Sequence, residues 1–186
     1  MKTMLIAGLG NPGKEYARTR HNAGFMFVDY FWEENRENFS EWEFSKKLNS
    51  EICFGKFEGK KIILLKPQTF MNLSGEAIAA ALKYYKIPCR GETSTNLIVA
   101  HDEIDLPLGT FRVSQNASSA GHQGVQNIID LLGTKDFTRL RIGVDSRKGK
   151  KIATEKYVLG KFTIIELRTI KDVLKKSTDE LIKDLS

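Results

Sequence analysis

Short apolar runs alternate with helical patterns along this chain, and this alternation constrains the fold more than any other feature of the sequence. The first run, residues 3–8, and a second within residues 96–103 have the length and composition of buried strands. Apolar residues at helical spacing follow the first run from Gly24 onward. Strands that alternate with helices predict a three-layer α/β domain, which we expect to span residues 1–186 as a single unit.

Local signals predict the remaining elements. Glu58 and Gly59 are turn residues between two strand patterns and indicate a hairpin. Thr163 and Glu166 have the spacing of a capping box, which marks the start of the last helix. The further predicted elements are strands at residues 51–57, 60–66, 110–115 and 137–145, and helices at residues 74–85, 125–132 and 163–181.

Charge and cysteine content limit the partners and the compartment. The formal net charge is +6, which favours a polyanionic partner because each Lys or Arg that neutralises a phosphate releases counterions. The densest basic run is "SRKGKK", residues 146–151, which is a solvated loop or a binding patch.

Cys53 and Cys89 are too few for a disulfide framework, and we expect reduced core thiols in a cytoplasmic protein. The longest apolar runs are too short for a membrane span, so no membrane association is expected.

A glycine-rich segment follows the first predicted strand. Gly8, Gly10 and Gly13 have the GxGxxG spacing that admits a pyrophosphate in dinucleotide-binding folds. In those folds the helix begins at the third glycine, whereas here the helical pattern begins only at Gly24. We therefore expect no nucleotide cofactor. The glycines are instead expected to turn the chain sharply and to display Asn11 at the carboxyl edge of the strand.

Polar side chains fall at several other predicted strand ends. His21 lies in the loop before the first helix, Asn72 lies where a strand passes into a helix, and Asp102 ends an apolar strand. His122 and Gln123 lie just before a helix start. A neutral histidine is the usual general base near neutral pH, and a carboxylate on its other ring nitrogen fixes its tautomer. The amides of Asn11 and Asn72 can bind a water or a carbonyl and stabilise an oxyanion. Together these residues would suffice for water-mediated hydrolysis of an acyl ester.

Each of these residues also has a purely structural interpretation, which spacing alone does not exclude. Asn11 precedes a proline and is a common turn former, and Asn72 is a candidate helix N-cap. A lone loop histidine such as His21 is more often a surface residue, and Asp102 could pair with a nearby arginine.

Other catalytic classes fit less well. A metal site needs three converging ligands, and the adjacent His101 and Asp102 would point to opposite faces of their strand. The GxSxG elbow of serine hydrolases and the GxxxxGK[ST] phosphate loop do not occur in the sequence. We therefore expect no metal.

Six separated motifs, in this order, closely resemble those of the bacterial-type peptidyl-tRNA hydrolases. They are "GLGNPGKEYARTRHNAG", "LLKPQTFMNLSGEAI", "IVAHDEIDLPLG", "SAGHQG", "RLRIGV" and "YVLGKF". The resemblance covers nearly the whole chain, from about Leu5 into the last predicted helix. It implies a monomeric α/β enzyme with a twisted mixed sheet between helices. Such an enzyme cleaves the ester that joins a peptide to the 3′-terminal ribose of tRNA, and so frees tRNA from prematurely released chains.

The resemblance implies roles for the residues at the strand ends. His21 matches the family's catalytic histidine, and Asp102 matches the aspartate paired with it. Asn11 and Asn72 match its two substrate-handling asparagines. The implied mechanism has His21, oriented by Asp102, activate a water that attacks the ester carbonyl, while side-chain amides hold peptide carbonyls and the oxyanion. No cofactor and no metal are implied.

The resemblance also implies contacts with the acceptor end and 3′ terminus of peptidyl-tRNA. Tyr16 matches a tyrosine that contacts the tRNA end, and Arg141 matches an arginine that helps to hold a tRNA phosphate. Phe70 and Met71 match the Phe-Met pair before the second asparagine. Such an apolar pair would ordinarily be core, although it could also line a cleft.

The chain departs from the family pattern at several positions. The family normally has "HNG" where this chain has "HQG", so Gln123 replaces an active-site asparagine. A misplacement of about 1 Å can cost on the order of 10²-fold in rate; we expect Gln123 still to serve, with local backbone adjustment. The preceding stretch "SQNASSA" lacks the family's glycines, Ser114 replaces a basic residue, and Asp145 and Arg147 replace a glycine and a proline. The chain therefore departs from the family more in the residues that contact tRNA phosphates than in the catalytic residues. The basic run at residues 146–151 is a candidate to supply the missing phosphate contacts.

Two other functions stay open at this point. One is a non-catalytic tRNA-binding protein with this fold, which the presence of both His21 and Asp102 disfavours because binding alone needs no base. The other is an esterase for a different acyl-nucleotide or a small ester, which the basic charge balance and Tyr16 disfavour.

Overall fold

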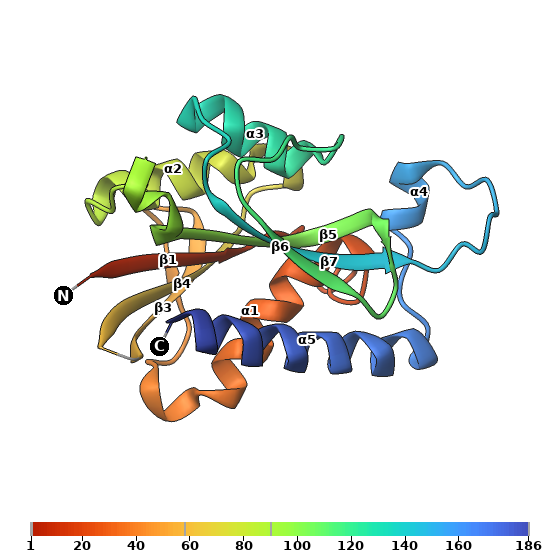
Figure 1. The fold of residues 1–186 in the computed structure, drawn as a ribbon, viewed down its shortest axis with the longest axis horizontal. Helices are drawn as coiled ribbons and strands as arrows, with labels where there is room; N and C mark the ends of the chain where they lie inside the picture. Colours follow the sequence, from red (N-terminus) through yellow and green to blue (C-terminus); the bar gives the residue numbers. More distant parts are fainter. Residues whose placement is uncertain (1, 58, 90, 186) are drawn as a thin grey trace.

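A twisted sheet of seven strands runs through the centre of the computed structural model of this chain, which describes residues 2–57, 59–89 and 91–185 (Figure 1). The strands lie side by side in the order β2-β3-β4-β1-β5-β7-β6. Their bounds are β1 (Thr3–Gly8), β2 (Glu43–Ser45), β3 (Ser50–Phe57), β4 (Lys60–Pro67), β5 (Leu97–Pro107), β6 (Phe111–Ser114) and β7 (Thr138–Asp145).

The central strands of the sheet are parallel, and antiparallel strands extend it on both sides. β1 pairs in parallel with β4 on one side and with β5 on the other, and β5 pairs in parallel with β7. β3 and β2 continue the sheet beyond β4, and β6 continues it beyond β7, all in antiparallel register. Because the central strands share a direction, their carboxyl ends meet at one edge of the sheet, where open α/β sheets bind their ligands.

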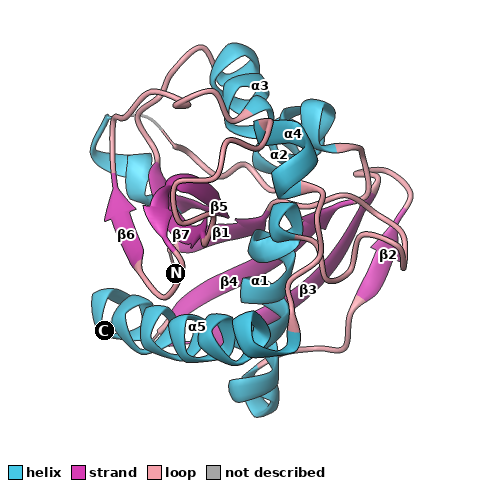
Figure 2. Cartoon of the chain, turned by 90° about the vertical axis from the view of Figure 1, so that its right-hand side faces the viewer, coloured by secondary structure: helices cyan, strands magenta, loops and turns pink. Residues whose placement is uncertain are grey.

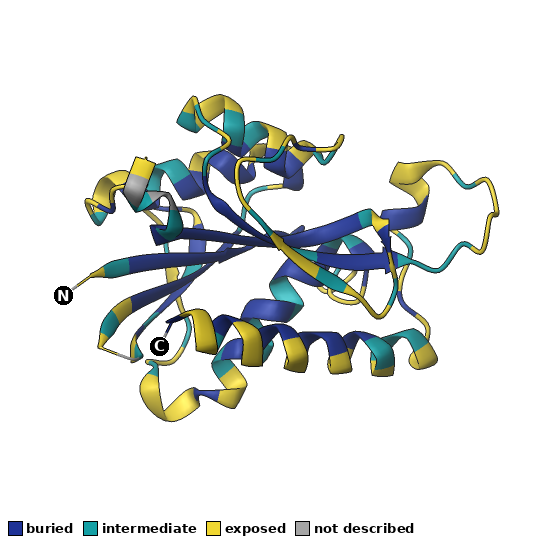
Figure 3. Cartoon of the chain, in the orientation of Figure 1, coloured by how far each residue is buried: buried dark blue, intermediate teal, exposed yellow. Residues whose placement is uncertain are grey.

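Helices cover both faces of the sheet and complete three layers. α1 (Ala23–Glu34) and α5 (Ile164–Leu185) pack on one face, and α2 (Ser74–Tyr84) and α3 (Gln123–Leu132) pack on the other. The central strands β1, β4, β5 and β7 and the inner sides of these helices are mostly buried, while the edge strands β2 and β6 and the outer sides of α3 and α5 are largely exposed (Figure 3). Strands covered on both faces can be apolar along their whole length, which explains the continuous runs in the sequence. The predicted fold class, a single three-layer α/β domain with a twisted mixed sheet, is confirmed.

The structure adds several short elements that the sequence pattern did not predict. Most of them have too few residues to show a periodicity. They are the edge strand β2, the short helix α4 (Thr154–Val158), and the 3₁₀ helices η1 (Arg20–Asn22), η2 (Arg36–Asn38), η3 (Met71–Leu73) and η4 (Gly91–Asn96).

The predicted hairpin and the predicted capping box are both confirmed. β3 and β4 pair in antiparallel register up to Phe57 and Lys60, and of the predicted turn residues Glu58 lies outside the described residues. At the start of α5, the backbone N–H of Thr163 donates to Oε2 of Glu166 at 2.7 Å, and the backbone N–H of Glu166 donates to Oγ1 of Thr163 at 3.3 Å.

The glycines on either side of the first loop allow α1 to pack closely against the sheet more than they turn the chain. A Cβ on Gly24 would lie 2.2 Å from the carbonyl oxygen of Ala100, and a Cβ on Gly8 would lie 2.2 Å from the carbonyl oxygen of Gly24. The first turn of α1 therefore rests directly on the ends of β1 and β5. Of the three glycines in the GxGxxG pattern, only Gly13 has a positive φ, 112°. The expectation that these glycines bend the chain holds at Gly13, whereas Gly8 is required by the approach of α1.

Both cysteines are thiols in this structure. Cys53 is buried in the sheet, and burial raises the pKa of its thiol to about 12. Cys89 is only partly buried and packs at the margin of the core beneath α2 and α3. Within the described residues, no helix combines the length and the apolar character needed to cross a bilayer.

Candidate active site

Polar side chains gather at the edge of the sheet where β1, β4 and β5 end, the edge that faces the viewer in Figure 2. The segment that leaves β1 is held against its neighbours by backbone hydrogen bonds. The N–H of Leu9 donates to the carbonyl of Ala100 at 2.9 Å, and the N–H of Phe25 donates to the carbonyl of Leu9 at 3.1 Å. These bonds bring the first loop, the start of α1 and β5 together.

His21 and Asp102, the expected base and its carboxylate, are in direct contact. His21 lies in η1 and Asp102 in β5, and Nδ1 of the imidazole is 2.9 Å from Oδ1 of the carboxylate. An ionised carboxylate only accepts hydrogen bonds, so the proton sits on Nδ1 of His21 and is donated to Asp102. Nε2 of His21 then carries the lone pair, which is the arrangement that a general base requires.

A second imidazole binds the same carboxylate oxygen. His122 caps α3, and its Nδ1 accepts the backbone N–H of Val125 at 3.3 Å. The proton of this ring is therefore on Nε2, which donates to Oδ1 of Asp102 at 2.8 Å. The third histidine of the chain completes the group, because Nδ1 of His101 bonds the backbone carbonyl of Asp102 at 2.7 Å and its ring lies 4.8 Å from that of His122.

The electrostatics of this group favour an ionised carboxylate beside a basic His21. Burial alone would raise the pKa of Asp102, but the two imidazoles that face it and their hydrogen bonds hold that pKa well below its usual range. Burial would lower the pKa of His21, and the charge and hydrogen bond of Asp102 outweigh it, so the pKa of His21 is raised above 6.5. His101 is completely buried, and burial together with His122 lowers its pKa well below 6.5, so it stays neutral.

Asn11 is buried and its orientation is determined by its neighbours. The side chain of Asn22 brackets its backbone, accepting the N–H of Asn11 at 2.9 Å and donating to its carbonyl at 3.0 Å. Oδ1 of Asn11 accepts the backbone N–H of Met71 at 2.8 Å, so the Nδ2 end of the amide is the end that can donate to another group. Asn11 thus connects η1, which carries His21, to η3, which carries Asn72, and is more than a turn residue.

The neighbours of Asn11 on η3 differ in exposure. Asn72 is exposed, and because the N-cap of α2 is Leu73, the interpretation of Asn72 as a helix cap is wrong. Phe70 is 56% exposed and Met71 is 4% exposed. The expectation that both apolar residues belong to the core holds only for Met71.

The remaining predicted residues lie outside the His21–Asp102 contact. Tyr16 is half-buried in the first loop, and Gln123 is exposed at the first position of α3, directly after His122. Arg141 lies in β7 and forms an ion pair with Glu103 of β5, with Nη2 and Oε2 2.9 Å apart. The run at residues 146–151 belongs to the loop between β7 and α4, where Arg147, Lys150 and Lys151 line a cavity of about 520 Å³.

The trio of His21, Asp102 and His122 also has a composition that could hold a metal ion. Within the described residues, their ligand atoms all lie within 4.8 Å of one another. The expectation of no metal rests on His101 with Asp102, and the structure brings together a different set. The two nitrogen–oxygen distances, 2.9 and 2.8 Å, are those of hydrogen bonds. Tetrahedral zinc ligands at about 2.0–2.1 Å from the ion would stand about 3.3 Å apart, so the ligands would have to separate and lose both protons.

Sequence reasoning assigned no role to two residues of the site, His122 and Asn22. In the sequence His122 is recognisable only as a residue at a helix start, and its bond with Asp102 depends on where β5 and α3 meet. Asn22 follows His21 directly, and its bonds to Asn11 span eleven positions. The sequence therefore offers a position at a helix start for His122 and adjacency to His21 for Asn22, and neither signal indicates the observed hydrogen bonds.

Comparison with known proteins gives one consistent result. A model of the family described as peptidyl-tRNA hydrolase matches residues 5–185. The peptidyl-tRNA hydrolase of Caldanaerobacter subterraneus subsp. tengcongensis is 44% identical over 178 residues, which cover 96% of this chain and 90% of that protein. The peptidyl-tRNA hydrolase of Bdellovibrio bacteriovorus is 42% identical over 175 residues, which cover 94% and 89%.

Solved structures agree with this similarity. The crystal structure of peptidyl-tRNA hydrolase from Acinetobacter baumannii superposes with a TM-score of 0.84 at 33% identity, covering 98% of this chain and 88% of that one. A crystal structure of a peptidyl-tRNA hydrolase in complex with N-propanol gives a TM-score of 0.86 at 33% identity, with the same coverage of 98% and 88%.

Proposed function

The chain belongs to the peptidyl-tRNA hydrolase family, and from this membership and the geometry of the site we propose how its residues carry out the reaction. The enzyme hydrolyses the ester bond between a peptide and the 3′-terminal ribose of tRNA. Two features of the reaction need help from the protein: a water must become nucleophilic near neutral pH, and negative charge on the carbonyl oxygen must be stabilised.

His21 is the general base of this proposal. Its Nδ1 proton is engaged by Asp102 at 2.9 Å, so Nε2 accepts a proton from water as the oxygen attacks the ester carbonyl. The imidazolium that forms is stabilised by the buried carboxylate. When the tetrahedral intermediate collapses, the same Nε2 proton is donated to the departing 3′ oxygen of the ribose, and the free peptide acid and tRNA leave.

Amides around His21 would hold the substrate and the developing oxyanion. Nδ2 of Asn11 is a donor in a fixed direction, since Oδ1 is engaged by Met71. Asn72 and Gln123 are exposed, the first directly after Met71 in the chain and the second directly after His122. A neutral amide stabilises an oxyanion through N–H donation without changing the net charge of the site, so no metal is required for this step.

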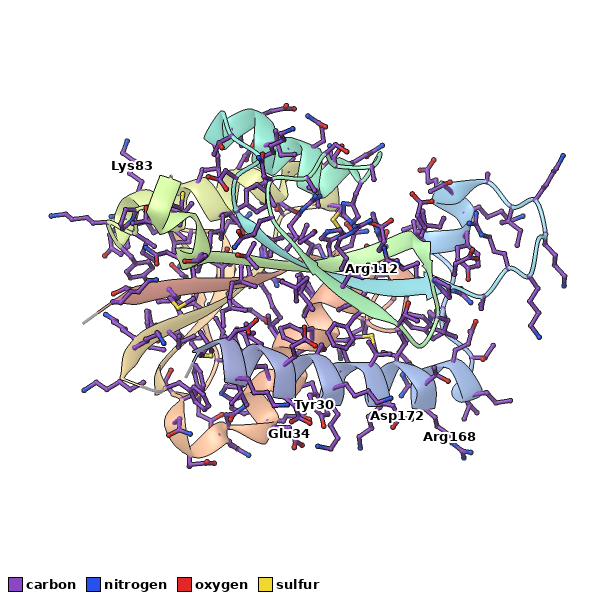
Figure 4. All side chains as sticks on the ribbon, viewed as in Figure 1. Tyr30, Glu34, Lys83, Arg112, Arg168 and Asp172 are labelled. Atoms are coloured by element: carbon purple, nitrogen blue, oxygen red, sulfur yellow. The ribbon has the colours of Figure 1, made fainter. Side chains whose placement is uncertain are left out.

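The tRNA end of the substrate would contact Tyr16, the exposed Phe70 and a set of basic residues. Arg141 of β7 lies opposite Arg112 of β6 in the register of the two strands and forms its ion pair with Glu103 of β5. Arg112 is labelled in Figure 4. Arg112 is exposed and lies two residues before Ser114, where the family has a basic residue, so it can supply a charge at that position. The long side chains of the loop at residues 146–151 project away from the fold (Figure 4) and would add further phosphate contacts.

We further propose that the enzyme acts as a monomer in the cytoplasm, where it recycles tRNA from prematurely released peptidyl-tRNA. The observation that carries the assignment of the active site is the hydrogen bond between His21 and Asp102 at the carboxyl edge of the sheet.

The test compares hydrolysis of N-acetyl-aminoacyl-tRNA with hydrolysis of unblocked aminoacyl-tRNA by the wild type and by His21→Ala. We expect the wild type to hydrolyse only the blocked substrate, His21→Ala to lose this activity while still binding tRNA, and a chelator selective for transition metals to have no effect. Activity that survives in His21→Ala would refute the role of the base. Activity that is abolished by the chelator and restored by zinc would instead assign the trio to a metal.

A further inference from the structure

One carboxylate, that of Glu166, joins three separate segments of the chain near the active site. It belongs to the first turn of α5, where it accepts the N–H of Thr163. It also accepts two hydrogen bonds from Nη2 of Arg20, at 2.9 and 3.0 Å, and one from the hydroxyl of Ser146 at the start of the β7–α4 loop. The hydrogen bonds to Arg20 and Ser146 are not needed to cap a helix, so the capping box does not account for them.

Arg20 is the residue directly before His21, and it is held from several sides. Its side chain is 10% exposed and stacks on the ring of Tyr157, with 4.4 Å between its guanidinium carbon and the ring centroid. Its backbone N–H donates to the carbonyl of Gly160 at 3.0 Å, and Nη1 donates to the carbonyl of Lys161 at 3.3 Å. Glu166 provides the only carboxylate in an ion pair with Arg20 among the described residues.

The segment that carries His21 cannot hold its own orientation. η1 is a 3₁₀ helix of three residues with no side-chain cap at Thr19, and a single turn of this kind is unstable in isolation. Its position must therefore come from contacts with the rest of the protein. On one side these contacts are the bonds of His21 and Asn22 to Asp102 and Asn11, and on the other side they are the bonds of Arg20.

We propose that Glu166 is a positioning residue for catalysis, which acts through Arg20 to hold η1 so that His21 meets Asp102 and the substrate in the productive orientation. This inference rests on the proposed role of His21 as the base. Glu166 touches neither substrate nor Asp102 in this assignment, and its whole effect on the reaction passes through the backbone of η1.

The competing explanation is that Glu166 only stabilises the fold, as a helix cap and as the partner of a buried arginine. A matched control separates the two. Thr163→Ala removes the hydroxyl that caps the N–H of Glu166, and it leaves the pair of Glu166 with Arg20 in place. Glu166→Gln has the opposite effect, because an amide still accepts from Thr163 but no longer carries the charge or the two-point contact with Arg20.

The experiment measures kcat and KM for N-acetyl-aminoacyl-tRNA, and the thermal midpoint, for the wild type, Glu166→Gln, Arg20→Lys and Thr163→Ala. We expect kcat of Glu166→Gln to fall by about 10- to 100-fold with KM changed less than about threefold, since small misplacements of a reacting group cost rates of this order. Arg20→Lys keeps one charged contact and should fall between the wild type and Glu166→Gln. Thr163→Ala should lower the thermal midpoint and keep kcat within about twofold of the wild type.

The outcomes distinguish this inference from the proposed function. If Glu166→Gln keeps the kcat of the wild type while His21→Ala is inactive, His21 is the base and the positioning role of Glu166 is refuted. If Thr163→Ala and Glu166→Gln lose activity in proportion to the fall in their thermal midpoints, the role is structural and the inference fails. If His21→Ala is active, the proposed base is wrong and the inference about Glu166 fails with it.

Discussion

The replacement of Asp102 by asparagine tests the electrostatic logic of the site most directly. With His21 as the proposed base, the acid limb of the pH profile of kcat/KM is expected to report the pKa of His21 in the free enzyme, because a base must be unprotonated to accept the proton of water. In the wild type, Asp102 outweighs the effect of burial and raises this pKa, so the midpoint of the acid limb is expected above pH 6.5. Asp102→Asn removes the charge and leaves burial, which lowers the pKa, and the midpoint should therefore move to lower pH.

The distance between the two groups makes this shift the main electrostatic effect of the substitution. An opposite charge within about 4–6 Å strongly favours the charged form of a titratable group, and Nδ1 and Oδ1 are only 2.9 Å apart. We therefore expect the midpoint of the acid limb to move to lower pH. The plateau rate should fall by about 10²- to 10⁴-fold, the usual contribution of a general base, because an asparagine can turn its NH₂ toward Nδ1 and force the imidazole proton onto Nε2.

The assay is single-turnover hydrolysis of N-acetyl-aminoacyl-tRNA between pH 5 and 8 at constant ionic strength. Asp105→Asn is the matched control, because Asp105 lies on the same strand, is exposed, and forms no bond through its side chain to the histidines within the described residues. We expect its profile to overlay that of the wild type. An acid limb of Asp102→Asn that stays in place, or that moves to higher pH, would show that the titrating base is not the His21 that faces this carboxylate.

Three further variants test the substrate contacts and the packing of the fold. Gln123→Ala should lower kcat by about 10²- to 10³-fold if its amide stabilises the oxyanion, whereas an unchanged rate in single-turnover assays would remove it from the site. Replacing Lys150 and Lys151 with glutamate should raise KM and weaken the dependence of tRNA binding on salt. The slope of log K against log salt concentration should fall by about one for each phosphate that the loop no longer neutralises. A slope equal to that of the wild type would exclude this loop from the tRNA-binding surface. Gly24→Ala should destabilise the protein by about 3 kcal/mol or more in denaturant unfolding. The added Cβ would lie 2.2 Å from the carbonyl oxygen of Ala100, so the backbone must move. A destabilisation below about 1 kcal/mol would mean that α1 shifts more easily than the packing suggests.

The architecture could be predicted from the sequence because it depends on local patterns. Continuous apolar strands followed by helices specify a covered sheet, and the predicted bounds of β1 coincide with the observed strand. His21 and Asp102 were candidates because both fall at predicted strand ends, and only the resemblance to a family paired them, since no local pattern relates residues 81 positions apart. His122 shows the limit more clearly, because its bond to Asp102 depends on the end of β5 and the start of α3 meeting in space.

The bond that was hardest to predict also constrains the most unusual residue of the site. Nδ1 of His122 caps α3 and Nε2 of the same ring is bonded to Asp102, so a single imidazole ties the start of α3 to the carboxylate that faces His21. The backbone at Gln123 begins from this anchored point and has little freedom to move without breaking one of the two bonds. The additional methylene of Gln123, compared with an asparagine, must therefore be accommodated by its side-chain rotamer, which an exposed position permits. A rotated side chain therefore accounts for the fit of Gln123 better than the expected local backbone adjustment. Gln123→Asn should retain activity and leave unchanged the pH profile that depends on His21.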